Sequence, residues 1–492
     1  MLGIQKTPAT RLGPPSVPLS RHHLTSPLHP STHQRIRLRS LATPVSSTSY
    51  AQLLEWLGEQ GVDARQNVDL TVPPTAAGGP ALIAVRPFAK GEIALSIPEP
   101  LWITKDTAAQ HFTPPLVDDL EAWVAVALFL IDQKARPDSP WRLYLDSLPH
   151  QLSTPVAWTD AELEQLQGTQ LLSTVQGYQT FFQQRFEQLQ ASLFSQQPDV
   201  FPSTTFTWDA FLWAACTVRA RTHAPLEGDE VALVPVADCI QHASRGSENA
   251  SWVVKPAGLF GRGRTLAVEV EKAFTDGNRP LTMRFDPGRT EGQILVDYGI
   301  IDVALSGGSF ALTITLPEDD RFFDDKIDVL EQEGLQASNE FVVRAGDGLP
   351  PNLLGTLRLV NLQGPDAFLL ESIFRAEAWA HMEQPVSEEN EQAVCQSIVD
   401  GCRAVLASYP TTVEEDVAAL KTAAPGSRLA AAVAVRLGEK EALESVLKLF
   451  ETRLEGLEGL EYYAERRLKR LGLLDKEGKP TDWDSFFEDG IA

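Results

Sequence analysis

The sequence predicts an α+β fold, in which a β fold is split by a helical insertion and followed by an all-helical C-terminal lobe. Short apolar runs separated by Gly and Pro, typical of strands, lie between residues 81 and 103 and again between 231 and 316. The residues between these two groups, and nearly all residues after 320, have the apolar period of helices. With 492 residues, 43% hydrophobic and 22% charged, the chain is long enough for two or three domains.

The first 50 residues differ in composition from the remainder. They hold six basic residues and no acidic one, and they are rich in Ser, Thr, Pro and His. This composition is typical of a plastid transit peptide and less so of a mitochondrial one; a plain disordered tail is the alternative. We expect residues 1–46 to be a disordered transit peptide that is removed near residues 40–50, and the mature protein to lie in the chloroplast stroma.

The remainder of the chain is strongly acidic. Six of the 42 Lys and Arg residues lie in that leader, which leaves 36 against 66 Asp and Glu residues, a net charge of about −30. So large a negative charge argues against nucleic acid as a partner and favours a protein or a small molecule. The longest central apolar run, 123–131, is too short to cross a bilayer, so no membrane partner is expected either.

Cysteine and histidine spacing predicts no metal site. The four cysteines, at 216, 239, 395 and 402, form no Cys-x-x-Cys pair, and the histidines lack the spacing of metal ligands. We therefore expect a metal-free protein from a reducing compartment. Cys395 and Cys402 are seven residues apart in a helical pattern and should share one buried face.

The elements of the β fold and its insertion follow from the apolar period and the turn residues. A helix is predicted over 50–60, and strands are predicted over 81–85 and 92–97 that would pair as an antiparallel hairpin. Within the insertion, Thr159 and Glu162 have the spacing of a capping box. Further helices are predicted over 121–133, 163–171, 176–195 and 208–221, and further strands over 231–236, 252–254, 266–270, 281–285, 294–297 and 310–316.

Helix caps divide the C-terminal lobe. Ser387 is placed to cap a helix over 388–407, and Thr412 and Glu415 have the spacing of a second capping box. Pro425-Gly426 precedes a long amphipathic segment over 428–455. The remaining helices are predicted over 353–361, 367–381 and 461–472.

Two of the predicted strands end in polar residues that would form one active site if the strand ends meet. These residues are Asp238, Gln241, His242 and Ser244 after the first strand, and Asp297, Tyr298 and Gly299 after the second. Asp238, His242 and Ser244 would also be a hydrolase triad, but they are close in sequence and no Gly-x-Ser-x-Gly elbow is present. Taken singly, a tyrosine in the position of Tyr298 is more often a packed aromatic, and a histidine such as His242 is more often an interior histidine than a catalyst.

Six longer runs carry a family resemblance. They are Leu-Asp-Ser-Leu-Pro at 145–149, Glu-Gln-Leu-Gln-Gly-Thr-Gln-Leu-Leu at 164–172, Val-Pro-Val-Ala-Asp at 234–238, Phe-Phe-Asp-Asp-Lys at 322–326, Gly-Pro-Asp-Ala-Phe-Leu-Leu-Glu-Ser at 364–372 and Glu-Tyr-Tyr-Ala-Glu-Arg-Arg-Leu at 461–468. In these runs the chain resembles the SET-domain protein-lysine methyltransferases of the plastid Rubisco large-subunit type. That family's layout implies a SET domain over 50–300 with its insertion at about 104–221, and a helical substrate-binding domain over 310–480.

The resemblance implies methyl transfer from S-adenosyl-L-methionine to a lysine ε-amine of a plastid protein, the Rubisco large subunit or fructose-bisphosphate aldolase. The family's reaction uses no metal. The residues that match the family's cofactor contacts are Gly78, Gly79, Pro80, Arg221, Gln241 and His242. Those that match its lysine site are Asp238, Trp252, Phe285 and Tyr298, with Tyr298 as the catalytic residue.

Some matched positions depart from the family's pattern. Pro80 removes a backbone donor from the cofactor turn, and Gln241 stands for an Asn that is one methylene shorter. Ala220 stands for a Ser, and Trp252 and Phe285 stand for tyrosines. Each lost hydrogen bond would cost about 1–3 kcal/mol of transition-state binding. A second interpretation is therefore a catalytically weak or inactive SET fold that binds a plastid protein.

Overall fold

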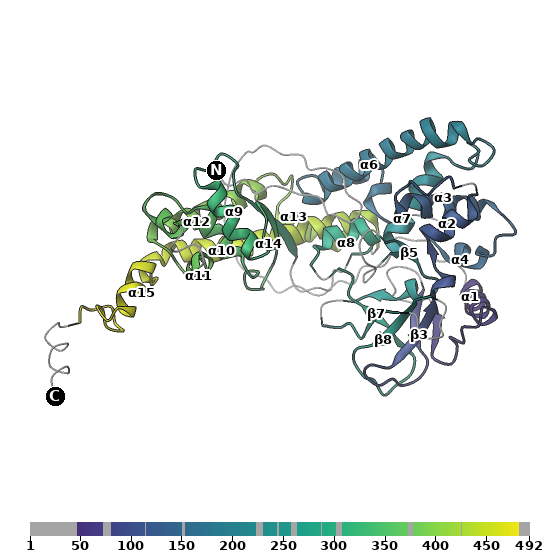
Figure 1. The fold of residues 1–492 in the computed structure, drawn as a ribbon, viewed down its shortest axis with the longest axis horizontal. Helices are drawn as coiled ribbons and strands as arrows, with labels where there is room; N and C mark the ends of the chain where they lie inside the picture. Colours follow the sequence, from purple (N-terminus) through teal and green to yellow (C-terminus); the bar gives the residue numbers. More distant parts are fainter. Residues whose placement is uncertain are drawn as a thin grey trace.

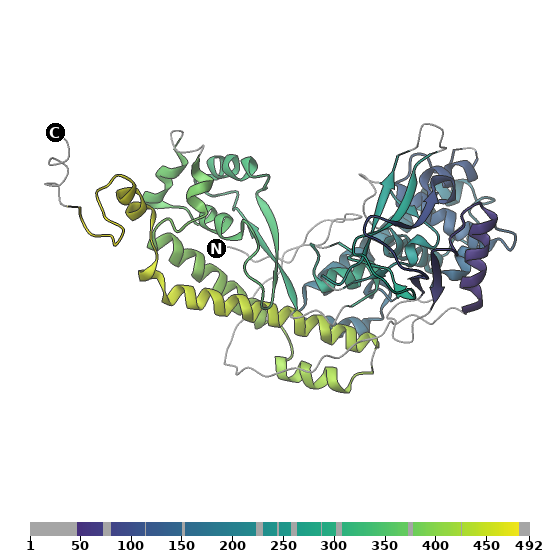
Figure 2. The same ribbon diagram turned by 90° about the horizontal axis from the view of Figure 1, so that it is seen from below.

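The structure, a computed structural model, describes residues 47–481 except 72–79, 114, 150–152, 223–229, 244–245, 257–262, 287, 302–307, 372–376 and 425. Two lobes lie at opposite ends of an elongated molecule, and the helix α14 (Arg428–Glu455) runs along both of them (Figures 1 and 2). The predicted α+β class is confirmed, while the predicted transit peptide lies outside the described residues.

Small sheets form the β part of the N-terminal lobe. One sheet holds β1 (Val68–Thr71), β2 (Ala81–Ala84) and β9 (Arg279–Pro280), and another holds β3 (Ile93–Pro98), β8 (Thr265–Val270) and β7 (Ala250–Lys255). Two-stranded pairs are formed by β4 (Ile103–Thr104) with β5 (Ala232–Leu233), and by β6 (Gln241–His242) with β10 (Thr282–Met283).

The predicted hairpin of residues 81–85 with 92–97 is wrong. β2 pairs with β1 and β9, whereas β3 pairs with β8, about 170 residues further along the chain. All four residues of β2 are buried, so this strand needs neighbours on both edges and covers on both faces. Segments distant in the sequence provide these neighbours. The short connection between residues 81–85 and 92–97 therefore does not make the two strands pair.

The predicted helical insertion is present between β4 and β5. Helix α1 (Ser47–Glu59) precedes the sheets, and the insertion holds α2 (Lys105–His111), α3 (Ala122–Ala135), α4 (Arg142–Ser147), α5 (Asp160–Leu163), α6 (Gln170–Leu189) and α7 (Trp208–Arg221). The capping box of Thr159 and Glu162 forms at the start of α5. Helix α3 is buried over most of its surface because α2, α4 and α7 all pack against it.

The predicted strand over 294–297 is wrong, because these residues belong to the helix α8 (Glu291–Tyr298). Its apolar run, Ile294 to Val296, has no period of its own and fits a strand and a buried helix equally well. The flanking residues decide for the helix: Thr290 and Gln293 form a capping box, and Gly299 ends the helix with a left-handed φ of 65°.

The C-terminal lobe is helical, as predicted, and also contains one antiparallel pair of strands. Its elements are β11 (Ser309–Thr315), α9 (Phe323–Gln332), β12 (Ser338–Arg344), α10 (Leu353–Val360), α11 (Ala378–Met382), α12 (Glu388–Leu406), α13 (Val413–Thr422), α14 and α15 (Tyr463–Arg470). The strand β12, which pairs with β11 along its whole length, was not predicted. The caps at Ser387 and Thr412 form as predicted. Instead of one helix over 367–381, a 3₁₀ helix covers Gly364–Leu370 and α11 begins at Ala378.

Helix α14 belongs to both hydrophobic cores. Its first turns place Ala431, Ala432 and Val435 in the core of the N-terminal lobe. Its later turns contribute Ala442, Leu443, Val446 and Phe450 to the core of the C-terminal lobe. At 28 residues the helix is about 42 Å long, enough to serve both.

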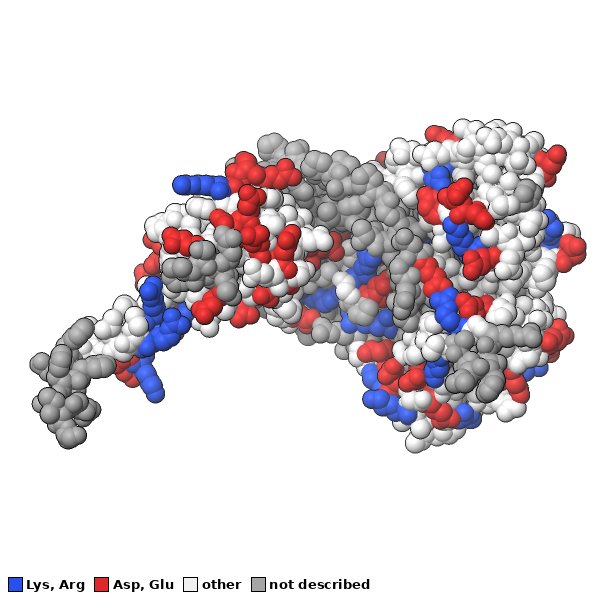
Figure 3. Space-filling model, viewed as in Figure 1, with Lys and Arg blue, Asp and Glu red and all other residues white. Residues whose placement is uncertain are grey.

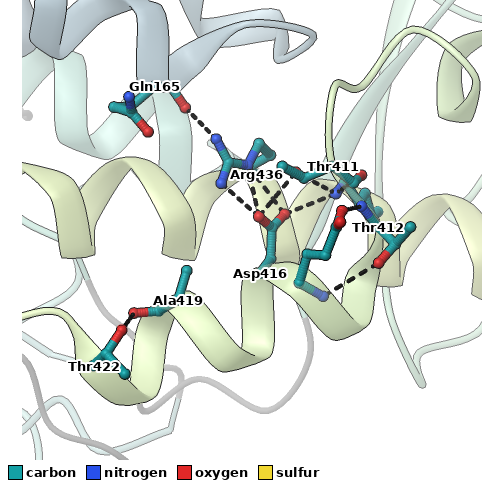
Figure 4. A network of polar contacts seen from close by, with 9 residues as sticks. Gln165, Thr411, Thr412, Asp416, Ala419, Thr422 and Arg436 are labelled. Atoms are coloured by element: carbon teal, nitrogen blue, oxygen red, sulfur yellow. Dashed lines mark hydrogen bonds and ion pairs between the residues drawn. The ribbon is translucent and has the colours of Figure 1, made fainter.

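A buried polar network surrounds the middle of α14 (Figure 4). The carboxylate of Asp416 on α13 accepts hydrogen bonds from Arg436 Nε at 2.9 and 3.0 Å and from Lys440 Nζ at 2.7 Å. Arg436 also donates to the carbonyl oxygen of Gln165 in the insertion, at 2.8 Å. Three charged groups therefore link α13, α14 and the N-terminal lobe.

Charge is unevenly distributed over the surface. Acidic side chains are spread over the C-terminal lobe in the view of Figure 3, whereas a basic group projects at its far end. That basic group is carried by α15, whose last turn contains Arg467, Lys469 and Arg470. Among the described residues, no helix is long and apolar enough to cross a bilayer.

We predict that Asp416→Asn destabilises the protein by about 3–5 kcal/mol at neutral pH, because Arg436 and Lys440 would remain buried without a counter-charge. Burial alone raises the pKa of Asp416, but the hydrogen bonds from Arg436 and Lys440 outweigh it, and the pKa is lowered. The carboxylate's contribution is therefore complete above the pKa of about 3.9 in the unfolded chain and is lost as pH falls through the lower folded value. In urea unfolding, the free energy of unfolding of the wild type should fall towards that of the variant only below about pH 4.

The matched control is Asp146→Asn, which breaks an exposed i,i+4 pair with Arg142 and should cost less than about 1 kcal/mol. Equal losses of stability in the two variants would contradict the role given to the buried network.

Candidate active site

The first predicted polar cluster lies beside the loop that precedes α8. Strand β6 pairs in parallel with β10, which places His242 opposite Met283. The backbone N–H of Phe285 donates to Nδ1 of His242 at 3.1 Å, and the two rings lie 5.1 Å apart. Nδ1 therefore serves as an acceptor, which leaves Nε2 as the ring nitrogen that can donate.

The second predicted polar cluster reaches the same loop from the end of α8. The ring of Tyr298 lies 4.8 Å from that of Phe285, centroid to centroid. Its hydroxyl donates to Oδ2 of Asp286 at 2.6 Å. Since this bond uses the hydroxyl's one hydrogen, the phenolic oxygen meets any further group as an acceptor. The structure thus brings His242, Phe285 and Tyr298 together.

Arg221 and Asp238 form a neighbouring buried group. Arg221, at the end of α7, donates from Nη1 to the carbonyl oxygen of Asp238 at 3.0 Å, and the same atom lies 3.8 Å from the Asp238 carboxylate. Tyr144 of α4 donates its hydroxyl hydrogen to that carboxylate at 2.7 Å. Burial raises the pKa of Asp238, and the charge of Arg221 and the bond from Tyr144 only partly offset this.

The backbone leading to Asp238 is strained. Val236 has φ 69° and ψ −45°, a conformation that β-branched residues rarely adopt. The 3₁₀ helix Ala237–Cys239 follows it directly and is fully buried. Asp286, the partner of Tyr298, also has a positive φ, of 41°. Such residues cost about 1–3 kcal/mol each and concentrate at functional sites.

An ion pair in the interior holds α7 against α8. Arg219 of α7 bonds to Asp297 of α8 through Nη2, and the two side chains are 2% and 1% exposed. Arg219 also donates to the hydroxyl of Tyr178 at 2.6 Å, and its guanidinium lies over that ring at 4.0 Å. Arg219 is two residues before Arg221, and Asp297 adjoins Tyr298. This pair therefore fixes the spacing between the two helix ends that carry predicted site residues.

The other predicted site residues lie on or next to strands of the N-terminal lobe, or outside the described residues. Gln241 lies on β6 opposite Thr282, and Trp252 is buried on β7 opposite Val268. Pro80 is buried just before β2, whose Leu82 carbonyl accepts the N–H of Leu281 at 2.8 Å. Gly78, Gly79 and Ser244 lie outside the described residues.

Sequence reasoning missed three residues of the site, Tyr144, Arg219 and Asp286, and it named Asp297 without its ion pair to Arg219. Tyr144 is 94 residues from Asp238, so no local pattern could have pointed to it. Arg219 and Asp297 carried a weak signal, because each is a charged residue that follows a mainly apolar stretch of its helix. Within the described ranges, no group of three or more His, Cys, Asp or Glu side chains could hold a metal ion.

We predict that Asp297→Asn lowers the free energy of unfolding by about 3–5 kcal/mol, because Arg219 would be left as an uncompensated charge in the interior. Chemical denaturation of the variant measures this loss. Glu55→Gln is the matched control, since Glu55 pairs with Arg65 at the surface, with the side chains 59% and 50% exposed. A variant at Asp297 as stable as the control would show that this ion pair does not hold the helices.

Three comparisons with known proteins agree on one group of relatives. A family model described as Rubisco LSMT substrate-binding matches residues 317–443. The chain is 36% identical over 454 residues to the [fructose-bisphosphate aldolase]-lysine N-methyltransferase, chloroplastic, of Arabidopsis thaliana, covering 91% of this chain and 93% of that protein. It is also 36% identical over 432 residues to the ribulose-1,5 bisphosphate carboxylase/oxygenase large subunit N-methyltransferase, chloroplastic, of Nicotiana tabacum, covering 87% of each.

The fold is similar to a solved structure of the same kind. It matches the SET domain of LSMT bound to lysine and AdoHcy with a TM-score of 0.74 and 33% sequence identity. The match covers 90% of this chain and 99% of that one. The similarity therefore extends through both lobes and is not confined to the region of the family model.

Proposed function

The chain belongs to the SET-domain protein-lysine methyltransferases of the Rubisco large-subunit type, and from this we propose that it methylates a lysine of the Rubisco large subunit or of fructose-bisphosphate aldolase in the chloroplast stroma. Members of this family are S-adenosyl-L-methionine-dependent protein-lysine N-methyltransferases. The two substrates are those named in the relatives, each of which is 36% identical to this chain and chloroplastic. The acid-free leader supports the location.

One observation carries the proposal for the site. Tyr298, at the end of α8, and His242, on β6, come from distant segments and are both in ring contact with Phe285. We propose that Tyr298 is the catalytic residue, and that Asp238, Trp252 and Phe285 line the channel of the substrate lysine. Trp252 and Phe285 are buried apolar rings, which suits a channel that takes in the lysine stem and excludes water.

The residues present fit the proposed cofactor contacts. S-adenosyl-L-methionine supplies a methyl group on a sulfonium sulfur and carries an amino-acid carboxylate. The Arg221 guanidinium has five N–H donors; it bonds to the Asp238 carbonyl and to Cys239, and its remaining donors suit a carboxylate. We propose that Arg221, Gln241 and His242 hold the cofactor, with Gly78, Gly79 and Pro80 forming the turn beside it.

These residues act on the lysine by desolvation and orientation. A free lysine has a pKa of about 10.4, and an apolar channel lowers it by disfavouring the ammonium form. The bound cofactor would supply its methyl group to this neutral nitrogen, and the methylated nitrogen would release a proton to solvent. Because the hydroxyl hydrogen of Tyr298 is held by Asp286, the phenolic oxygen accepts from the amine and aligns its lone pair with the methyl group.

The test uses the full chain with S-adenosyl-L-methionine and three acceptors: free lysine, Rubisco large subunit and aldolase. Mass spectrometry should show methyl groups added to a lysine of one of the two proteins. We predict that Tyr298→Phe lowers kcat about 10²–10³-fold, because it removes the oriented oxygen, while calorimetry finds the cofactor affinity unchanged.

Tyr462→Phe is the control for Tyr298→Phe, since that hydroxyl bonds to the Leu457 carbonyl far from the site, and it should keep full activity. If S-adenosyl-L-methionine does not bind at millimolar concentration, the proposed methyltransferase activity is refuted. Binding without transfer to any acceptor would favour the non-catalytic module.

A second variant tests the position given to Phe285. We predict that Phe285→Tyr raises kcat about 5- to 10-fold, because its ring already lies against Tyr298 and a second hydroxyl would help to align the amine. Steady-state kinetics with free lysine measure this gain. Unchanged kcat would mean that this ring does not face the reacting groups.

A further inference from the structure

The C-terminal lobe is bonded directly to the helix that carries Tyr298. Arg344, the last residue of β12, donates from Nη1 to Glu291 Oε1 at 2.8 Å and from Nη2 to the carbonyl of Arg289 at 2.7 Å. Glu291 is the first residue of α8. The side chains of Arg344 and Glu291 are only 16% and 15% exposed, so solvent screens this ion pair weakly.

Strand β11 supports the same contact. Ser309, which is paired with Arg344 in the β11–β12 register, donates its hydroxyl hydrogen to the Glu291 carboxylate. Its Oγ also accepts the backbone N–H of Glu291 at 3.2 Å. Two residues further on, Gln293 of α8 donates from Nε2 to Glu340 of β12 at 3.2 Å. The first turn of α8 is thus held by both strands of the lobe's small sheet.

The far end of α8 is in the proposed active site. The helix has eight residues and spans about 12 Å, so it moves as one body while its backbone hydrogen bonds are intact. A shift at Glu291 therefore reaches Asp297 and Tyr298. Figure 1 shows α8 at the side of the N-terminal lobe that faces the C-terminal lobe, beside α14.

We propose that Arg344 is a positioning residue for methyl transfer: through Glu291 and the rigid helix α8, the C-terminal lobe sets the placement of the Tyr298 hydroxyl. The proposal rests on the proposed catalytic role of Tyr298. Arg344 itself touches neither substrate nor cofactor in this scheme. Its loss acts on the rate of transfer and leaves the binding of S-adenosyl-L-methionine intact, because His242 lies on β6 and Arg221 is also held by its own bond to the Asp238 carbonyl.

The test compares Arg344→Ala with Arg403→Ala in the full chain. Arg403 forms an exposed pair with Glu451 on the same lobe, far from α8, and serves as the matched control. With free lysine as acceptor, Arg344→Ala should lower kcat about 10-fold, with KM and the calorimetric cofactor affinity unchanged. Arg403→Ala should match the wild type. The charge exchange Glu291→Arg with Arg344→Glu should restore part of kcat, which would assign the effect to this ion pair.

Two results would overturn the proposal. The first is an unchanged kcat with free lysine in Arg344→Ala. The second is a defect confined to KM for the protein acceptor, which would make Arg344 a docking residue only.

Hydrogen–deuterium exchange separates this proposal from the proposed function. Backbone amides of 294–298 should exchange at least 5-fold faster in Arg344→Ala than in the wild type or in Arg403→Ala. If the wild type methylates none of the acceptors, the proposed function fails, and the exchange rates alone decide whether the lobe positions α8. Equal rates in all three proteins would then refute the coupling.

Discussion

The buried ion pair between Arg219 and Asp297 is the interaction on which the rest of the candidate site depends. Neither charge has access to water, so neither helix end can move away from the other without exposing an unpaired charge in the interior. Two guanidinium nitrogens of Arg219 and one carboxylate oxygen of Asp297 find no partner among the described residues, so the pair is not optimised for stability. Its value lies in specifying one geometry for the residues beside it, Arg221 and Tyr298.

Contacts between the two lobes fix the positions of further elements of the chain. Helix α14 gives apolar residues to both cores, and the Asp416 network fixes it to the insertion. Helix α8 lies where the lobes meet and is held by β11 and β12 at one end and by α7 at the other. A protein-modifying enzyme must present its reactive groups in fixed relation to a surface that a partner protein can contact. The connections between the lobes provide that relation.

Much of the fold was predictable wherever its cause was local. The caps at Thr159, Ser387 and Thr412 and the long helix from 428 were predicted correctly, because a capping residue and an apolar period are properties of a few adjacent residues. The pairing of β2 was not predictable, since its partners are chosen by burial in three dimensions. The helix α8 was misassigned although its capping residue Thr290 was visible, because three consecutive aliphatic residues suggested a strand.

The candidate site also contains residues that could be predicted from the sequence and residues that could not. His242 and Tyr298 were predicted from their place after apolar runs and from a family resemblance, and the structure places both against Phe285. The residues that hold the site in position were not predicted. Tyr144 and Arg219 act through partners that lie 94 and 78 residues away, and no pattern in a single sequence encodes such distances.

One of the contacts along α14 has a consequence for biosynthesis. The backbone N–H of Gln170, at the first turn of α6, donates to Glu439, a residue 269 positions later in the chain. The N-terminal lobe can therefore satisfy its buried polar groups only once the chain is present as far as α14. Until then its insertion exposes a surface that α14 will cover, and such exposed surface makes an incomplete chain prone to aggregation. Shortening the C-terminus would leave the N-terminal lobe unfinished as well.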